Sequence, residues 1–208
     1  MLVTTIAELD KKRSLVTLDN EFSFVLYKGE LRLYKVKENS EISPDVYREI
    51  IEVVLPKRAK LRAMNLLKVR PYTYKGLSQK LKDGQYPDNI IKIAMDYVCS
   101  YGYVNDEEYV RQYVTTYMDR KNKARMRQDL LTKGAPKDII DNVMSEIFEE
   151  ADCDYEIEQI KVYLIKKHFD PDNSSYEERM KLLSALCRKG YNIEKCKRAI
   201  GSLEDSFT

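Results

Sequence analysis

The residues that could carry chemistry in this sequence are few and widely spaced. His168 is the single histidine, and it stands in the run KKHFDPDN. A histidine acts as a general base only with a nucleophile and an orienting acid in reach, and no motif places either beside it. Asp106 meets the same objection, because no histidine lies near it in the sequence. We interpret His168 as a surface or loop residue, and we expect no catalytic residue.

The cysteines also lack a chemical pattern. Cys99, Cys153, Cys187 and Cys196 form no C-x-x-C pair and share no histidine cluster, the spacings on which metal and redox sites depend. Cys187 and Cys196 take the places of apolar residues in a recurring helical frame described below, which favours core packing. Neither G-x-G-x-x-G nor G-x4-G-K-[ST] occurs to bind phosphate. We expect a reduced, cytoplasmic, non-enzymatic chain without metal or cofactor.

Basic residues are the polar residues that gather. Residues 59–104 hold eight Lys and Arg against three Asp and Glu, although the whole chain has a net charge of only +2. The candidate binding residues form two clusters: Lys60, Arg62, Lys68, Arg70, Lys75, Lys80 and Lys82, then Arg120, Lys121, Lys123, Arg125 and Arg127. Either cluster alone can be a solvated face, but two on consecutive units form a track for a nucleic-acid backbone or an acidic protein groove. We expect the alanine pairs Arg70 with Lys75, and Arg125 with Arg127, to weaken binding and leave stability nearly unchanged.

The N-terminal part has the residue pattern of a small β-sheet. Residues 2–37 alternate apolar and polar positions and are rich in β-branched and aromatic side chains, a pattern typical of short strands. Asp19-Asn20 and Lys28-Gly29-Glu30 are the predicted turns. A helix is then predicted to start at Pro44 and to be stopped by Pro56. No window approaches the roughly 18 apolar residues needed to span a bilayer, so we expect no membrane segment.

A helical frame recurs three times in the rest of the chain. It consists of an apolar pair four residues apart, a residue suited to a left-handed helix end, and an apolar residue where packing resumes. The copies are Leu77-x3-Leu81-x3-Gln85-Tyr86-x4-Ile91, Met126-x3-Leu130-x3-Gly134-Ala135-x4-Ile140 and Leu182-x3-Leu186-x3-Gly190-Tyr191-x4-Cys196. Each copy follows a further amphipathic helix, which makes three helices per unit. A unit of about 45 residues buries little apolar surface alone, so neighbouring units should stack.

The expected fold is mainly α, with tandem three-helix repeats in an elongated curved array and a small N-terminal β-rich element. The predicted divisions are 1–58 for the strand-rich extension plus helix, 59–104 for the first repeat, 105–150 for the second and 151–208 for the third. Tyr109, Tyr113 and Tyr117 recur every four residues on one helix face. We interpret them as a packing seam between units.

Three stretches, taken in order, resemble the RecX family of bacterial regulators of the RecA recombinase. They are LLKVRPYTYKGLSQKL (66–81), GYVNDEEYVRQYV (102–114) and RMRQDLLTKGAPKDII (125–140). The resemblance covers residues 59–205, and the N-terminal part is similar to the extension of longer members. Gln85 departs from the pattern, because the first repeat of the family usually has Gly there. Gly84 stands one place earlier, so a shifted helix cap is predicted.

The resemblance implies a protein that binds along the groove of the RecA nucleoprotein filament, and we expect it to be a monomer. It would modulate the recombinase, most often by inhibition, with effects on DNA repair, recombination and the SOS response. The alternative is a sequence-independent protein that binds single- or double-stranded DNA and competes for it; a helical scaffold for another partner is a third possibility. Salt dependence separates the first two, because each phosphate contact adds to the slope of affinity against salt.

Overall fold

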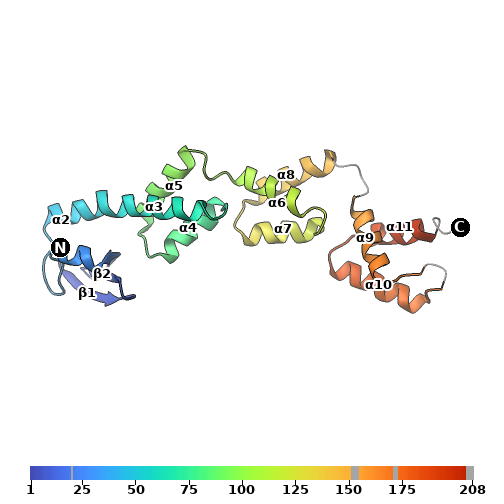
Figure 1. Ribbon diagram of the computed structural model, residues 1–208, viewed down its shortest axis with the longest axis horizontal. Helices are drawn as coiled ribbons and strands as arrows, with labels where there is room; N and C mark the ends of the chain where they lie inside the picture. The colour runs from blue at the N-terminus through green and yellow to red at the C-terminus, as the bar shows by residue number, and fades with distance from the viewer. Residues whose placement is uncertain (20, 151–154, 171–172, 205–208) are drawn as a thin grey trace. The chain divides into compact units, whose positions relative to one another are not determined.

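The computed structural model describes residues 1–19, 21–150, 155–170 and 173–204, and it is mainly helical (Figure 1). Three strands open the chain: β1 (Val3–Glu8), β2 (Arg13–Leu18) and β3 (Phe22–Tyr27). They form one antiparallel sheet in the order β1-β2-β3, in which Leu18 pairs with Phe22 at the second hairpin. Asn20 of the predicted turn lies outside the described residues. The predicted N-terminal β-rich element is confirmed.

The segment after β3 is a helix and not the further strand that its alternation predicted. Lys28-Gly29-Glu30 begins α1 (Lys28–Leu33) in place of a hairpin turn. The Glu30 carboxylate accepts a hydrogen bond from the backbone N–H of Tyr27 at 2.7 Å and also binds the guanidinium of Arg58. Residue alternation could not predict this helix, because Arg58 lies 28 residues further along the chain than Glu30.

A continuous helical stretch follows: α2 (Pro44–Glu49), the π-helical segment η1 (Ile50–Val54) and α3 (Leu55–Leu67). The Ser43 hydroxyl caps its start by accepting the N–H of Val46. The predicted stop at Pro56 is wrong. In the π segment the N–H of Leu55 bonds to the carbonyl of Ile50, five residues back. This wider turn accommodates Pro56, which has no N–H to donate.

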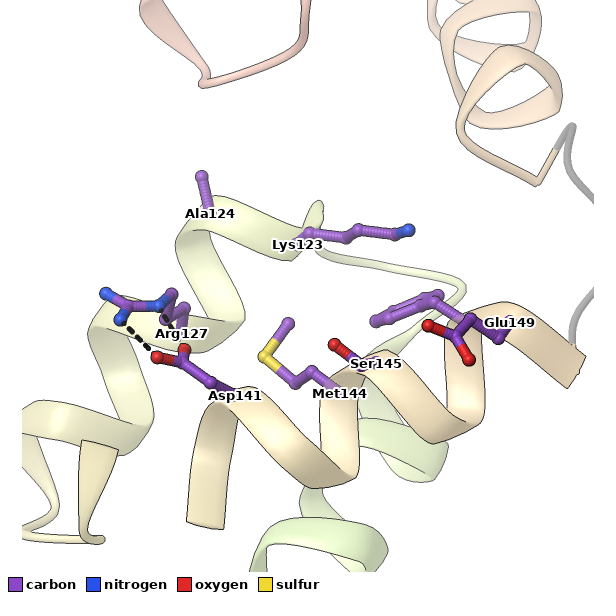
Figure 2. A pocket seen from close by; sticks show the side chains of 8 residues that line it. Lys123, Ala124, Arg127, Asp141, Met144, Ser145 and Glu149 are labelled. Atoms are coloured by element: carbon purple, nitrogen blue, oxygen red, sulfur yellow. Dashed lines mark hydrogen bonds and ion pairs between the residues drawn. The ribbon is translucent and has the colours of Figure 1, made fainter. Parts of the chain in front are cut away.

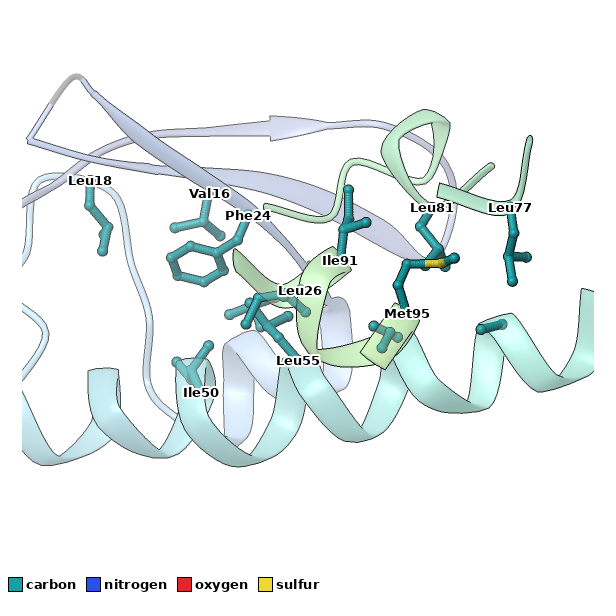
Figure 3. Close-up of a cluster of buried hydrophobic side chains, with 14 of the residues drawn as sticks. Val16, Leu18, Phe24, Leu26, Ile50, Leu55, Leu77, Leu81, Ile91 and Met95 are labelled. Atoms are coloured by element: carbon teal, nitrogen blue, oxygen red, sulfur yellow. The ribbon is translucent and has the colours of Figure 1, made fainter. Parts of the chain in front are cut away.

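The first three-helix module is completed by α4 (Tyr74–Asp83) and α5 (Asp88–Ser100). Its buried side chains and those of the sheet form one hydrophobic cluster (Figure 3). Phe24 and Leu26 of the sheet, Leu55 of α3 and Met95 of α5 are all essentially inaccessible to solvent. The sheet and the first module therefore share one core, within a compact unit that runs from Met1 to Asn105.

The second compact unit begins at Asp106 and holds two further modules. The second module consists of α6 (Asp106–Tyr117), α7 (Lys123–Thr132) and α8 (Lys137–Glu150), and the third of α9 (Tyr155–Lys166), α10 (Tyr176–Arg188) and α11 (Ile193–Glu204). Each has its own buried cluster, around Val110 and Leu130 in the second and around Ile160 and Leu186 in the third. Tandem three-helix modules are confirmed. The elongated curved array and the divisions at residues 58, 104 and 150 stay predictions.

The recurring frame ends a helix in the same way in each module. The second residue of its apolar pair is fully buried in each copy, at Leu81, Leu130 and Leu186. Four residues later the backbone is left-handed, with φ of 62° at Gln85, 86° at Gly134 and 95° at Gly190. The following N–H returns to the leucine carbonyl at 3.4, 3.1 and 3.2 Å respectively. These bonds satisfy carbonyls that the helix end would otherwise leave without a donor.

Gln85 is the exception in this set because it is not a glycine. The predicted shift of the cap to Gly84 is wrong, since Gly84 has an ordinary φ of −79°. Gln85 takes the left-handed conformation at the position that the frame requires. A side chain in this conformation crowds the backbone and costs about 1 kcal/mol relative to glycine. Burial of Leu81 and its neighbours holds the turn in place against this cost.

Candidate partner-binding surface

The first module presents a surface rich in cations and poor in acids. Residues 53–82 contain nine Lys and Arg and no Asp or Glu. Lys60 and Arg62 lie on α3, Lys68 and Arg70 at its end and in the following turn, and Lys75, Lys80 and Lys82 on α4. All are exposed except Lys60, which is half-buried. The structure therefore places the whole first cluster on one module.

The seven cations of this cluster differ in whether an acid neutralises them. Lys80 lies 3.3 Å from Asp83, and Lys82 lies 3.5 Å from Asp88. Within the described residues, the others have no acidic partner: Lys60, Arg62, Lys68, Arg70 and Lys75. Because exposed charges keep most of their hydration, these five cations are available to an anionic partner at little desolvation cost.

Two of the five available cations lie over tyrosine rings. The ammonium of Lys60 is 4.9 Å from the centre of the Tyr97 ring, and the guanidinium of Arg70 is 4.7 Å from the centre of the Tyr72 ring. A cation held over a ring loses some rotamer freedom but keeps its charge. These contacts orient the two side chains before any partner arrives.

The second cluster is mostly neutralised within its own module. The Lys121 ammonium lies 2.8 Å from the Asp129 carboxylate, and the Arg125 guanidinium lies 3.1 Å from the same carboxylate. Arg127 of α7 binds both carboxylate oxygens of Asp141 of α8, at 2.8 and 3.1 Å. In the part of the chain that the structure describes, Arg120 and Lys123 are left without an acid, and the Lys123 ammonium lies 4.1 Å above the Phe148 ring.

The pairing of these groups shifts their pKa values. The hydrogen bond that Lys121 donates to Asp129 raises the pKa of Lys121 and lowers the pKa of Asp129 below 3.8. The Arg127 hydrogen bond likewise lowers the pKa of Asp141. Each acid thus stabilises the folded module by holding a cation, and these cations are less available to a partner than those of the first module.

A groove of about 570 Å³ lies between α7 and α8. Figure 2 shows Lys123 and Arg127 facing it from α7, and Asp141, Met144 and Glu149 from α8. Both signs of charge line this groove around the apolar Met144 side chain. A phosphate group would meet the two carboxylates here as well as the cations, so the lining does not favour a dedicated phosphate site.

The residues first considered for chemistry lie apart from one another. His168 is exposed in the turn that ends α9, with φ of 54°, as a loop residue should be. Cys196 is fully buried, and burial raises the pKa of its thiol to about 11. Cys187 is exposed, so the prediction that it packs in the core is wrong. Leu186, its neighbour on the helix, is the residue that faces the core. Cys153 lies outside the described residues.

The described residues contain neither a metal-ligand cluster nor a membrane-spanning helix. Among them, His, Cys, Asp and Glu never gather in a group of three or more that could hold a metal ion. The helices of the same residues are all too short or too polar to cross a bilayer.

The tyrosines of α6 pack inside the second module. Tyr113 is buried in the core of this module, and its hydroxyl donates to the Asp129 carboxylate at 2.9 Å. Tyr117 lies against the Tyr113 ring, with 4.6 Å between ring centres. For Tyr113, the predicted seam between units is therefore a contact between α6 and α7 of one unit. The four-residue spacing predicted burial but could not indicate which helix would cover the ring.

Sequence reasoning missed the acids that neutralise the second cluster. The pair Arg125 and Asp129 has the helical spacing of four residues, so it could have been read from the sequence. The pair Arg127 and Asp141 joins two helices across 14 residues and has no local signal. The number of Lys and Arg in a stretch of sequence therefore overestimates the charge that a partner can reach wherever acids from other segments lie beside those cations in the folded protein.

Tandem three-helix modules, the first of which carries cations without an acidic partner in the described residues, define this chain as a protein of helical modules. The family model described as "RecX, first three-helix domain" matches residues 59–97. A curated relative named regulatory protein RecX, from Caldanaerobacter subterraneus subsp. tengcongensis, is 29% identical over 96% of this chain and 98% of its own. Another of that name, from Clostridium beijerinckii, is 28% identical over 94% of this chain and 91% of its own.

Two solved structures share the fold. A crystal structure of regulatory protein RecX covers 94% of this chain and 97% of its own, with a TM-score of 0.61 and 19% identity. The crystal structure of RecX from Lactobacillus salivarius covers 73% of this chain and 97% of its own, with a TM-score of 0.64 and 19% identity. Similarity to proteins named RecX thus extends over nearly the whole chain, and the solved structures share its fold.

Proposed function

We propose that this chain is a non-catalytic inhibitor of the RecA recombinase that binds along the groove of the RecA nucleoprotein filament. Its action would affect DNA repair, recombination and the SOS response. Similarity over nearly the whole chain to curated relatives named regulatory protein RecX supports a regulatory role. The direction of regulation and the binding mode are our proposal.

The observation that carries the proposal is the set of five first-module cations without an acidic partner in the described residues: Lys60, Arg62, Lys68, Arg70 and Lys75. Like charges fixed on one small module repel one another, which opposes folding in the absence of a partner. A nucleoprotein filament offers phosphates and carboxylates along its length. Binding it would relieve the repulsion and release counterions.

Repetition of the modules supports a mechanism based on several weak contacts. One contact by Arg120 or Lys123 of the second module adds little by itself. Once the first module is bound, however, the second encounters the filament at a high effective concentration. A repeating partner is then bound much more tightly than a single recombinase protomer. Filament growth or exchange would be blocked sterically, without any chemical step.

The alternative is direct, sequence-independent DNA binding, and one observation favours it. Tyr101 and Tyr103 are 61% and 50% exposed, and their rings stack nearly parallel, with 5.7 Å between centres and 13° between planes. Exposed flat rings provide a surface on which unpaired bases can stack. In this case the effect on recombination would come from competition for the strand.

The proposal is tested by measuring the ATPase of filaments formed on single-stranded DNA at substoichiometric amounts of the protein. We expect inhibition at salt concentrations where the protein alone barely binds DNA. The triple variant Arg62→Ala, Lys68→Ala and Lys75→Ala should lose most of this inhibition. A matched triple variant in the third module, Lys166→Ala, Lys167→Ala and Lys197→Ala, removes the same charge and should retain it.

Two results would count against filament binding. Inhibition that requires enough protein to coat the DNA, with a salt slope of about −0.7 per phosphate contact on single strands, would support competition for DNA. Equal loss of inhibition in the two triple variants would show that only total charge matters, and the first-module surface would then have no specific role.

A further inference from the structure

The turn between α3 and α4 carries an apolar side chain at its tip. Val69 is 82% exposed, the largest exposed fraction among the large hydrophobic side chains of the described residues. Single exposed apolar residues are common on protein surfaces and need no explanation by themselves. Val69, however, stands between Lys68 and Arg70, two exposed cations for which the described residues supply no acid.

The backbone of this turn is held firmly. The N–H groups of Lys68 and Val69 bond to the carbonyls of Met64 and Leu66, at 3.0 and 3.1 Å. Pro71 restricts the next part of the turn, and the buried hydroxyl of Thr73 caps α4 by accepting the N–H of Gly76 at 3.0 Å. A partner that binds the tip therefore meets a preformed shape, and little conformational entropy is lost on binding.

The arrangement combines an apolar anchor with a cationic rim. Arg70 is oriented by the Tyr72 ring, at 4.7 Å, so one rim group is already positioned. Contact with phosphates alone would use Lys68 and Arg70 and leave Val69 in water. The Val69 side chain is branched and short, so it offers no flat face on which a base could stack. The apolar side chain between two cations and the lack of a flat face for stacking both fit a protein partner better than a nucleic acid.

We propose that Val69 enters a small apolar pocket on the partner protein, and that Lys68 and Arg70 pair with carboxylates at the edge of that pocket. The inference rests on the proposed function and identifies this turn as the part of the first module that contacts a recombinase protomer directly. Val69 supplies buried apolar area, which slows dissociation, and the two cations supply long-range attraction, which speeds association.

The test measures binding of the full chain to recombinase filaments by surface plasmon resonance at several salt concentrations. Val69→Ser should bind about tenfold more weakly, because it loses most of the apolar area of one valine. The loss should appear as faster dissociation with an unchanged salt slope. Lys68→Ala with Arg70→Ala should instead slow association and reduce the salt slope. Leu33→Ser, at a residue that is 71% exposed in the same compact unit, is the matched control and should bind like the wild type.

Val69→Thr separates shape from polarity, because threonine keeps the branched shape and replaces a methyl with a hydroxyl. It should bind more weakly than the wild type, and its melting temperature should not change, since position 69 is exposed. Bare single- and double-stranded DNA should bind Val69→Ser and the wild type equally. An equal loss of affinity for bare DNA would show that the tip enters nucleic acid, and the protein pocket would be rejected.

The outcomes distinguish this inference from the function on which it rests. If the wild type does not bind filaments, the proposed function fails and the anchor fails with it. If the wild type and Val69→Ser bind filaments equally well, the function stands and the anchor alone is rejected.

Discussion

The ammonium of Lys121 and the carboxylate of Asp129 lie 2.8 Å apart, and both contact the hydroxyl of Tyr113. Lys121 comes just before α7, Asp129 lies on α7, and Tyr113 lies on α6. The three groups therefore tie two helices of the second module to the turn between them. A lysine that its sequence places in a binding cluster has a structural role here.

Lys121→Met should destabilise the protein by about 2 kcal/mol, because it leaves the partly buried carboxylate of Asp129 without its strongest partner. Urea denaturation monitored by circular dichroism measures the loss. Lys123→Met is the control, because Lys123 lies over the Phe148 ring without an acidic partner in the described residues. If the two variants were equally stable, the pair would contribute nothing to folding.

The same pair predicts how stability depends on pH. The pKa of Asp129 is lower in the folded protein than its ordinary 3.8, mainly because Lys121 donates to it. Its stabilising contribution is therefore present above about pH 4 and is lost as the pH falls through the lowered pKa. Asp129→Asn removes this contribution, so its stability deficit relative to the wild type should be largest near neutral pH and shrink below pH 3.8. A deficit that is constant across this range would contradict the assignment.

Tyr113→Ala should cost on the order of 3 kcal/mol, because it removes a buried aromatic ring from the second module. Tyr113→Phe keeps the ring and removes only the hydroxyl, so it should cost about 1 kcal/mol. Thermal denaturation of both variants separates the contribution of packing from that of the hydrogen bonds. Wild-type stability of the alanine variant would mean that the ring lies on a surface.

Gln85→Gly should stabilise the protein by about 1 kcal/mol, because glycine adopts a φ of 62° without steric cost. Gly102→Gln is the reverse substitution. Gly102 ends α5 at a φ of 69°, and a Cβ there would meet no atom within 4 Å, so any loss of stability reports backbone conformation alone. Melting temperatures that rise for the first variant and fall for the second would support backbone strain at Gln85. No change in either would show that the left-handed turn carries no strain.

Arg127→Ala should lower the melting temperature, in contrast to the sequence-based expectation that the alanine pair at Arg125 and Arg127 leaves stability nearly unchanged. The change removes the bidentate contact with Asp141 that joins α7 to α8. Lys75→Ala is the matched variant, because Lys75 has no acidic partner among the described residues and its loss should leave the melting temperature unchanged. Equal melting temperatures for the two variants would mean that the Arg127 pair is too solvated to matter.

Most of the fold could be predicted from periodicity. Leu81, Leu130 and Leu186 recur at helical spacing before a left-handed residue, and each is fully buried at a helix end. Periodicity works here because the burial of a helix face depends on residues only three or four positions apart. It failed at Glu30 and Pro56, where an ion pair to a distant arginine and a π turn decided the local structure.

The candidate site could be predicted only in part. The sequence by itself determined where cations gather, because composition is a local property and residues 53–82 contain no acid. Only the tertiary structure decided which cations remain available to a partner. Asp141 of α8 lies beside Arg127 of α7 and neutralises it, whereas no described acid lies within reach of Arg62 or Lys75. The physical reason is that neutralisation depends on distance in space, and distances between helices follow from how the cores pack.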